Sequence, residues 1–229
     1  MPGAAARGLL LRGPLPDVKI CGLSTPETLD AALAAGAAWV GFVHFPRSPR
    51  HLALDGASAL ASRAAGRAGR VVLLVDPDDA TVAAAVEAVD PDLIQLHGRE
   101  TPERVAAIRA AAGRPVMKAL GIAGRADLER VLAYADVADR ILLDAKAPPG
   151  AELPGGNGAP FDWSILDGIA LPPGTMLSGG LTAENVTEAL ARTGLDALDV
   201  SSGVESAPGV KDVGRIAAFI AAARRARAP

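Results

Sequence analysis

Short apolar runs alternate with alanine-rich amphipathic segments along the chain from Pro16 onward. The apolar runs are nearly continuous, which is typical of strands buried on both faces of a parallel sheet. We expect such strands at 17–21, 38–43, 70–75, 92–96, 115–120, 140–144, 175–178 and 197–201. Helices are expected between them at 26–35, 55–66, 78–88, 102–112, 125–133, 182–192 and 212–226, with a shorter helix near 162–167.

Eight strand–helix repeats predict a single-domain α/β fold, a closed (β/α)8 TIM barrel. A doubly wound open sheet is the alternative architecture. Its dinucleotide-binding form has a glycine-rich turn after the first strand, whereas this chain has Gly22-Leu23-Ser24-Thr25-Pro26 there. We therefore expect the barrel to span residues 17–226, preceded by a loosely ordered N-terminal extension over residues 1–16.

Two helix starts carry the same local signal. Thr25-Pro26-Glu27 and Thr101-Pro102-Glu103 each place a hydroxyl residue before a proline. Proline is tolerated in the first helical turn, and a hydroxyl side chain can cap the free backbone N–H groups there. We expect Thr101 to cap the second of these helices, and either Ser24 or Thr25 to cap the first.

Composition narrows the functional classes. The 229 residues include one cysteine and three histidines, and the net charge is −3. One cysteine excludes an internal disulfide and a cysteine-cluster metal site, so we expect no metal. The charge balance gives no reason to expect nucleic-acid binding, and no run approaches the ~20 apolar residues of a membrane span. We expect a cytoplasmic protein with no obligatory protein partner.

Two strand ends carry reactive groups. Val18-Lys19-Ile20-Cys21-Gly22 places the lone thiol at the end of one strand, and Arg140-Ile141-Leu142-Leu143-Asp144 places a carboxylate at the end of another. Catalytic groups of such barrels lie at the C-terminal ends of the strands, so the pair suggests a base and an acid facing one pocket. Alternatively, Cys21 is a buried core thiol and Asp144 a helix cap or turn residue.

A lysine lies two residues before the thiol. Lys19 and Cys21 point to the same side of their strand, since side chains alternate with a period of two. The last strand neighbours the first in a closed barrel, and it carries Asp199. We expect a Lys19–Asp199 pair below the thiol.

Glycine-bearing turns follow the last two strands, in Leu177-Ser178-Gly179-Gly180-Leu181 and Asp199-Val200-Ser201-Ser202-Gly203. Loops at these positions commonly form a phosphate site in barrels, although each could be an ordinary tight turn. We expect a small phosphorylated substrate. The residues assigned to its binding are Gly179, Gly180, Asp199, Ser201, Ser202 and Gly203.

Three further features face the same end of the expected barrel. Arg50 follows the second strand, and its planar fork suits a carboxylate, although it could instead be a solvated surface arginine and Arg47 competes for the role. His97 ends the fourth strand and is either a pocket wall or a histidine held by backbone carbonyls. The Pro/Gly-rich stretch 146–160 lies inside a strand–helix connection, where we expect a lid with Asn157 on its inner side.

Several short motifs in order resemble the phosphoribosylanthranilate isomerase family over most of the chain, from Asp17 to about Ala223. They are Lys19-Ile20-Cys21-Gly22, Gly41-Phe42-Val43, Ser48-Pro49-Arg50, Gln95-Leu96-His97-Gly98, Leu142-Leu143-Asp144, Phe161-Asp162-Trp163, Leu177-Ser178-Gly179-Gly180-Leu181 and Asp199-Val200-Ser201-Ser202-Gly203-Val204-Glu205.

This resemblance implies a (β/α)8 barrel without a cofactor. It implies that Cys21 is the general base, Asp144 the general acid and Arg50 the contact to the anthranilate carboxylate. The implied reaction is the Amadori rearrangement of N-(5′-phosphoribosyl)anthranilate to 1-(2-carboxyphenylamino)-1-deoxyribulose 5-phosphate in L-tryptophan biosynthesis. Two other classes stay open: an isomerase or epimerase of another sugar phosphate, and a sugar-phosphate-binding barrel without activity.

Overall fold

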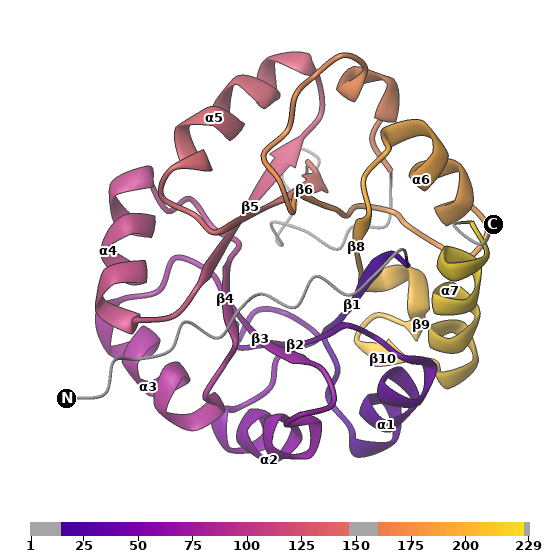
Figure 1. Cartoon of the computed structure of the whole chain (residues 1–229). Coiled ribbons are helices and arrows are strands. Elements are labelled where there is room, and N and C mark those ends of the chain that lie inside the picture. Colours follow the sequence, from indigo (N-terminus) through magenta and orange to yellow (C-terminus); the bar gives the residue numbers. More distant parts are fainter. Residues whose placement is uncertain (1–14, 147–159, 227–229) are drawn as a thin grey trace.

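The computed structural model describes residues 15–146 and 160–226, which form a closed barrel of eight parallel strands surrounded by helices (Figure 1). The strands are β1 (Asp17–Cys21), β2 (Trp39–Val43), β3 (Gly69–Leu74), β4 (Leu93–Leu96), β5 (Val116–Ile122), β6 (Arg140–Ala145), β7 (Met176–Leu177) and β8 (Ala197–Val200). They pair in chain order, and β8 closes the barrel against β1. The predicted (β/α)8 fold is confirmed, and the open doubly wound sheet is excluded.

Helices cover the outside of the barrel (Figure 1). In the described residues they are α1 (Pro26–Ala35), α2 (Leu54–Ala64), α3 (Asp79–Val89), α4 (Pro102–Ala112), α5 (Glu129–Ala135), α6 (Val186–Thr193) and α7 (Val213–Arg225). Single 3₁₀ turns form η1 (Arg125–Leu128), η2 (Trp163–Leu166) and η3 (Ser202–Val204). None of the helices in these ranges is long and apolar enough to cross a membrane.

The cap signals place two helix starts correctly. The Thr25 hydroxyl accepts a hydrogen bond from the backbone N–H of Thr28 at 3.3 Å, and Thr101 accepts one from Arg104 at 3.3 Å. Each threonine satisfies a backbone donor that has no partner within its helix. The helices predicted at 26–35 and 102–112 have these bounds in the structure.

Two predicted helices are shorter or broken, because side chains compete with the helical backbone. The helix expected at 125–133 divides into η1 and α5, and the Asp127 carboxylate accepts from the N–H groups of Ala123 and Gly124. The helix expected at 182–192 begins only at Val186, since the Asn185 side chain accepts from the N–H of Thr182. Such local bonds stabilise a turn in place of the first helical residues.

A small antiparallel pair, β9 (Glu205–Ala207) and β10 (Val210–Lys211), lies between η3 and α7. The sequence analysis expected no strands there. The pair matters for the site because it brings Glu205 and Lys211 beside the end of β1, as described below.

Packing inside the barrel positions the reactive end. Apolar side chains fill the interior, among them Trp39, Val71, Leu93, Met117, Leu142 and Met176. A barrel interior of this kind is a packed core rather than a pore. Nearer the C-terminal strand ends, polar side chains such as Gln95, Asp144 and Asp199 line a pocket together with the apolar Val43 and Leu73.

Two predictions fall largely outside the described residues. Residues 1–14 of the expected N-terminal extension lie outside them, so the extension and its boundary with the barrel stay predictions. Residues 147–159, with Asn157, lie outside them as well, so the expected lid also stays a prediction.

Candidate active site

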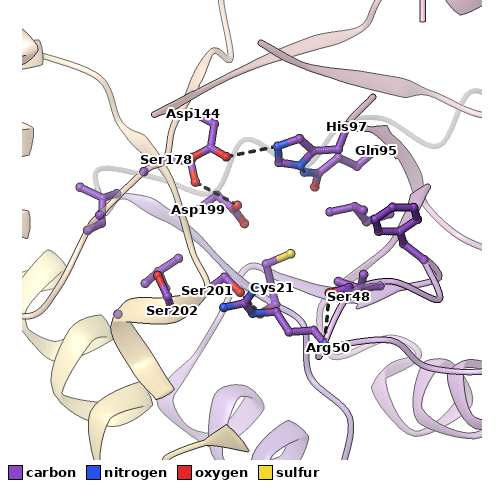
Figure 2. A pocket seen from close by; sticks show the side chains of 18 of the residues that line it. Cys21, Ser48, Arg50, Gln95, His97, Asp144, Ser178, Asp199, Ser201 and Ser202 are labelled. Carbon is purple, nitrogen blue, oxygen red and sulfur yellow. Dashed lines mark hydrogen bonds and ion pairs between the residues drawn. The ribbon is translucent and has the colours of Figure 1, made fainter. Parts of the chain in front are cut away.

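A pocket opens at the C-terminal end of the barrel, where residues from several strand ends and their loops line it (Figure 2). Every residue that the sequence analysis assigned to catalysis or substrate binding lines it: Cys21, Arg50, Asp144, Gly179, Gly180, Asp199, Ser201, Ser202 and Gly203. The topology therefore brings together groups from β1, β6, β7 and β8, from the loops after them and from the loop after β2, while the role of each group stays a prediction.

The thiol of Cys21 lies at the end of β1 and is 4% exposed. Below it, the fully buried Lys19 donates to Asp199 Oδ1 at 2.7 Å, which confirms the expected pair. Burial raises the pKa of the Cys21 thiol, and the positive charge of Lys19 offsets this only in part. A thiol with a raised pKa is less often ionised, but its thiolate is a stronger base once formed.

The partners of Asp199 fix it in the pocket wall. Its second oxygen accepts from the Ser178 hydroxyl at 3.3 Å, so both carboxylate oxygens have protein partners. Burial lowers the pKa of Lys19, but the charges and hydrogen bonds of Asp199 and Cys21 together outweigh burial, and the pKa of Lys19 is raised. Lys19 therefore stays a cation below the thiol.

Asp144 lies at the end of β6 and is 3% exposed. One carboxylate oxygen accepts from the backbone N–H of Ala145 at 3.0 Å, and the other lies 3.2 Å from His97 Nε2. His97 Nδ1 in turn lies 3.1 Å from the amide nitrogen of Gln95. His97 is thus a pocket-wall residue whose ring is held between two side chains, and not a histidine held by backbone carbonyls.

The glycine-bearing turns after β7 and β8 meet at one side of the pocket. A side-chain carbon at Gly203 would lie 1.9 Å from the carbonyl oxygen of Leu181, so only glycine permits this approach. The 3₁₀ turn η3 begins at Ser202, and the N–H groups of Ser202 and Gly203 have no partner within that turn. These groups can serve as donors to an anion in the pocket.

The two candidate arginines differ in position. Arg50 is 7% exposed and lines the pocket, whereas Arg47 is exposed and does not line it. Arg50 Nε and Nη2 donate to the two oxygens of Glu205 at 2.7 and 2.8 Å. The geometry therefore favours Arg50 over Arg47 as the carboxylate contact. It also shows that Glu205 already binds two of the guanidinium nitrogens of Arg50.

Sequence reasoning missed Glu205 and Lys211 as partners of the site, and it missed the contact between His97 and Asp144. Glu205 and Lys211 lie on the unexpected pair β9–β10, and Lys211 donates to Glu205 Oε1 at 2.6 Å. The contact of His97 with Asp144 joins the non-adjacent strands β4 and β6, so strand order could not reveal it. Among the described residues, no group of three or more metal-ligating side chains gathers in one place.

The fold and the site together define a class of protein. A closed (β/α)8 barrel with a thiol, a carboxyl group and two glycine-bearing turns in one pocket at the C-terminal strand ends has the architecture of a barrel enzyme that binds a small anionic molecule.

Known proteins identify the particular family. The family model for N-(5′-phosphoribosyl)anthranilate (PRA) isomerase matches residues 18–222. The N-(5′-phosphoribosyl)anthranilate isomerase of Azorhizobium caulinodans is 64% identical over 212 residues, covering 93% of each chain. That of Rhizobium meliloti is 54% identical over 212 residues, covering 93% of this chain and 99% of its own. This chain belongs to the N-(5′-phosphoribosyl)anthranilate isomerase family, as its motifs implied.

Solved structures agree with this assignment. The phosphoribosyl anthranilate isomerase of Thermotoga maritima superposes with a TM-score of 0.81 at 35% identity, covering 92% of this chain and 100% of its own. A crystal structure of such an isomerase in complex with reduced 1-(o-carboxyphenylamino)-1-deoxyribulose 5-phosphate has a TM-score of 0.78 at 33% identity, with the same coverage. The two other classes, an isomerase of a different sugar phosphate and a binding barrel without activity, are set aside.

Proposed function

We propose that Asp144 and Cys21 carry the proton transfers of the reaction that family membership assigns to this chain. That reaction is the isomerisation of N-(5′-phosphoribosyl)anthranilate to 1-(2-carboxyphenylamino)-1-deoxyribulose 5-phosphate in L-tryptophan biosynthesis. The observation that supports the two roles is that a thiol and a carboxyl group line one pocket together with the glycine-bearing turns. Each positioned proton transfer contributes about 10²–10⁴-fold to the rate.

Ring opening is the first step. Asp144 in its protonated form donates its proton to the furanose ring oxygen, and the bond from that oxygen to C1′ breaks. The lone pair of the anthranilate nitrogen forms the C1′=N double bond of a protonated Schiff base. The backbone N–H of Ala145 and the ring of His97 hold the Asp144 carboxyl group, so its orientation toward the ring oxygen of the substrate is fixed.

Proton abstraction follows. The Cys21 thiolate removes the proton from C2′, and the bonding electrons form the C1′=C2′ double bond of an enolamine while the nitrogen becomes neutral. The enolamine then tautomerises: the C2′ hydroxyl loses its proton, C1′ gains one, and the C2′ ketone results. Because burial raises the pKa of Cys21, its thiolate is a base strong enough to be useful against a carbon acid.

Two anchors hold the substrate. The N–H groups of the turns at Gly180, Ser202 and Gly203 receive the phosphate, and Arg50 receives the carboxylate of the anthranilate ring. Fixing both ends holds the reacting C1′ and C2′ atoms between the acid and the base.

A crystal structure with reduced 1-(o-carboxyphenylamino)-1-deoxyribulose 5-phosphate tests this arrangement. We expect the phosphate against the backbone of the turns after β7 and β8, the carboxylate against Arg50, and the reduced sugar carbons between Cys21 and Asp144. An anion bound elsewhere at the C-terminal end of the barrel, with these turns empty, would show that the phosphate assignment is wrong.

We also propose a cytoplasmic location. The supporting observation is that Cys21 is a free thiol whose proposed role needs it reduced. A cytosolic redox poise keeps single thiols reduced, whereas oxidising compartments do not.

A further inference from the structure

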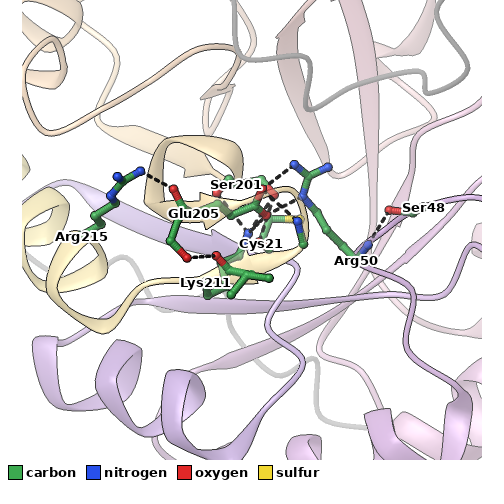
Figure 3. A network of polar contacts seen from close by, with 10 residues as sticks. Cys21, Ser48, Arg50, Ser201, Glu205, Lys211 and Arg215 are labelled. Carbon is green, nitrogen blue, oxygen red and sulfur yellow. Dashed lines mark hydrogen bonds and ion pairs between the residues drawn. The ribbon is translucent and has the colours of Figure 1, made fainter.

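The guanidinium group of Arg50 is held by Glu205 at the edge of the active-site pocket (Figure 3). Arg50 Nε donates to Glu205 Oε1 at 2.7 Å, and Nη2 donates to Oε2 at 2.8 Å. The arginine is 7% exposed and the glutamate 6%. Paired, parallel bonds of this kind fix the plane of the guanidinium as well as its distance.

The stem of Arg50 has little room to move away from this position. A side-chain carbon built at Gly22 would lie 2.9 Å from Arg50 Cδ, so the arginine packs directly over the backbone that follows Cys21. Gly22 has a φ of +77°, which also favours glycine. The Arg50 backbone N–H is held as well, since it donates to the Ser48 hydroxyl at 3.1 Å.

Glu205 is itself held on its other side. Lys211 Nζ donates to Glu205 Oε1 at 2.6 Å, and the same ammonium donates to the carbonyl and hydroxyl oxygens of Ser201 at 3.1 Å each. The backbone N–H of Gly209 donates to Glu205 Oε2 at 3.3 Å. Glu205 is therefore a fixed group, because the pair β9–β10 places all of these donors around it.

Glu205 stays a carboxylate beside Arg50. Burial opposes ionisation of Glu205, but the hydrogen bonds and charges of Arg50 and Lys211 together outweigh it, and the pKa of Glu205 lies below its ordinary value. Burial also lowers the pKa of Lys211, and the charge of Glu205 opposes this only in part. The pairing with Glu205 uses two of the three guanidinium nitrogens of Arg50 and leaves Nη1 for a ligand in the pocket.

We propose that Glu205 is a positioning residue for carboxylate recognition: it holds Arg50 so that Nη1 meets the carboxylate of the substrate, and that carboxylate binds without displacing Glu205. This inference rests on the proposed role of Arg50 in the reaction. In this arrangement Arg50 binds the substrate carboxylate through Nη1 alone, and Glu205 sets the orientation of the guanidinium group. Arg50 does not bind the substrate through two parallel hydrogen bonds.

Binding of two ligands to the full-length enzyme, measured by calorimetry, tests the proposal. The first ligand is reduced 1-(o-carboxyphenylamino)-1-deoxyribulose 5-phosphate, and the second is the same molecule without the ring carboxylate. A hydrogen bond to a charged group is worth about 1.5–3 kcal/mol, so the wild type should prefer the first ligand by at least about tenfold. Glu205→Gln should reduce this preference about tenfold while leaving the affinity for the second ligand within about twofold.

Three further variants sharpen the comparison. Arg50→Met should abolish the preference, and Arg50→Met/Glu205→Gln should behave like Arg50→Met, since Glu205 acts through Arg50. Glu87→Gln removes a charge from an exposed position on α3 and should keep the full preference. If circular dichroism shows that Glu205→Gln does not fold, Glu205→Asp is the substitute variant. Its side chain keeps the charge but is one methylene shorter, so the variant should lose part of the preference for the ligand with the ring carboxylate.

Each result has a distinct meaning. A preference for the carboxylate ligand that is unchanged in Glu205→Gln, or that increases because Arg50 has been released, would overturn this proposal. Equal losses for both ligands would do so too, because they would indicate a merely structural role. A wild type that binds both ligands equally would instead contradict the proposed role of Arg50, and a wild type that binds neither would contradict the proposed site.

Discussion

His97 Nε2 lies 3.2 Å from Asp144 Oδ2, across the mouth of the barrel from the end of β4 to the end of β6. The second ring nitrogen of His97 is also engaged, at 3.1 Å from the amide nitrogen of Gln95. Gln95 is completely buried, so it holds the imidazole in one orientation. The proposed acid therefore has a side-chain partner whose own position is fixed by the barrel interior.

Replacing this partner should slow the chemical step. In His97→Ala the Asp144 carboxyl group loses one of its two hydrogen bonds, and its orientation toward the ring oxygen is less defined. Coupled groups of this kind interact by about 0.5–3 kcal/mol, so we expect kcat to fall about tenfold. Steady-state kinetics check this, with His51→Ala, outside the pocket lining, as the matched histidine control. An unchanged kcat would show that Asp144 needs no help from His97.

Removal of the thiol should abolish most turnover. Cys21→Ala leaves the fold and the binding of the reduced product analogue largely intact, since the replaced atom is one sulfur at the pocket surface. A general base is worth at least about 10²-fold, so kcat should fall by that factor or more. A spectroscopic turnover assay measures it, and a variant that keeps more than about a tenth of the wild-type kcat would rule out Cys21 as the base.

Asp144→Asn should affect kcat far more than KM. The amide keeps the shape of the side chain and loses the transferable proton. We expect kcat to fall by about 10²-fold or more with a small change in KM, because the lost interaction belongs to the transition state. The same assay, run over a range of substrate concentrations, separates the two constants. A rise in KM alone would make Asp144 a binding group and leave the acid unassigned.

The buried pair below the thiol should dominate stability. Lys19→Met leaves Asp199 as a charge with no ionic partner in the barrel interior, which costs about 3–5 kcal/mol in the free energy of unfolding. Urea denaturation measures this cost. The exposed pair Arg192–Asp167 supplies the control, and Arg192→Gln should cost under about 1 kcal/mol. A loss below that control value for Lys19→Met would mean that Asp199 finds another partner.

Local and periodic signals explain what the sequence predicted correctly. The Lys19–Asp199 pair follows from two rules: side chains alternate along a strand, and the first and last strands of a closed barrel are neighbours. The caps at Thr25 and Thr101 depend only on residues within one helical turn. The gathering of Cys21 and the glycine-bearing turns in one pocket follows because all of them end strands of the same barrel.

The missed contacts depend on three-dimensional packing that no local pattern encodes. Arg50 and Glu205 are 155 positions apart, and they lie beyond the ends of the barrel strands β2 and β8. Their approach requires the pair β9–β10, whose five residues are too few for a periodic signal. His97 and Asp144 are in contact although β5 lies between their strands. The contact therefore follows neither from the order of neighbouring strands nor from the register of a strand pair.

The last prediction concerns pH. The thiolate is the basic form of Cys21, and burial raises the pKa of the thiol, with Asp199 adding to the effect and Lys19 and Lys211 opposing it. Below that raised pKa the thiol is protonated, so the rate of alkylation of the enzyme by iodoacetamide, which needs the thiolate, should increase with pH through a value above the ordinary thiol pKa of about 8.5. The pH profile of kcat/KM does not report this value alone, because the proposed acid must be protonated while the thiol is ionised. Asp144→Asn provides the control for alkylation, since it keeps the thiol and its cations but not the proposed acid. Alkylation that stays level from acidic pH through the ordinary thiol value would show that Cys21 is ionised throughout and that the cations outweigh burial.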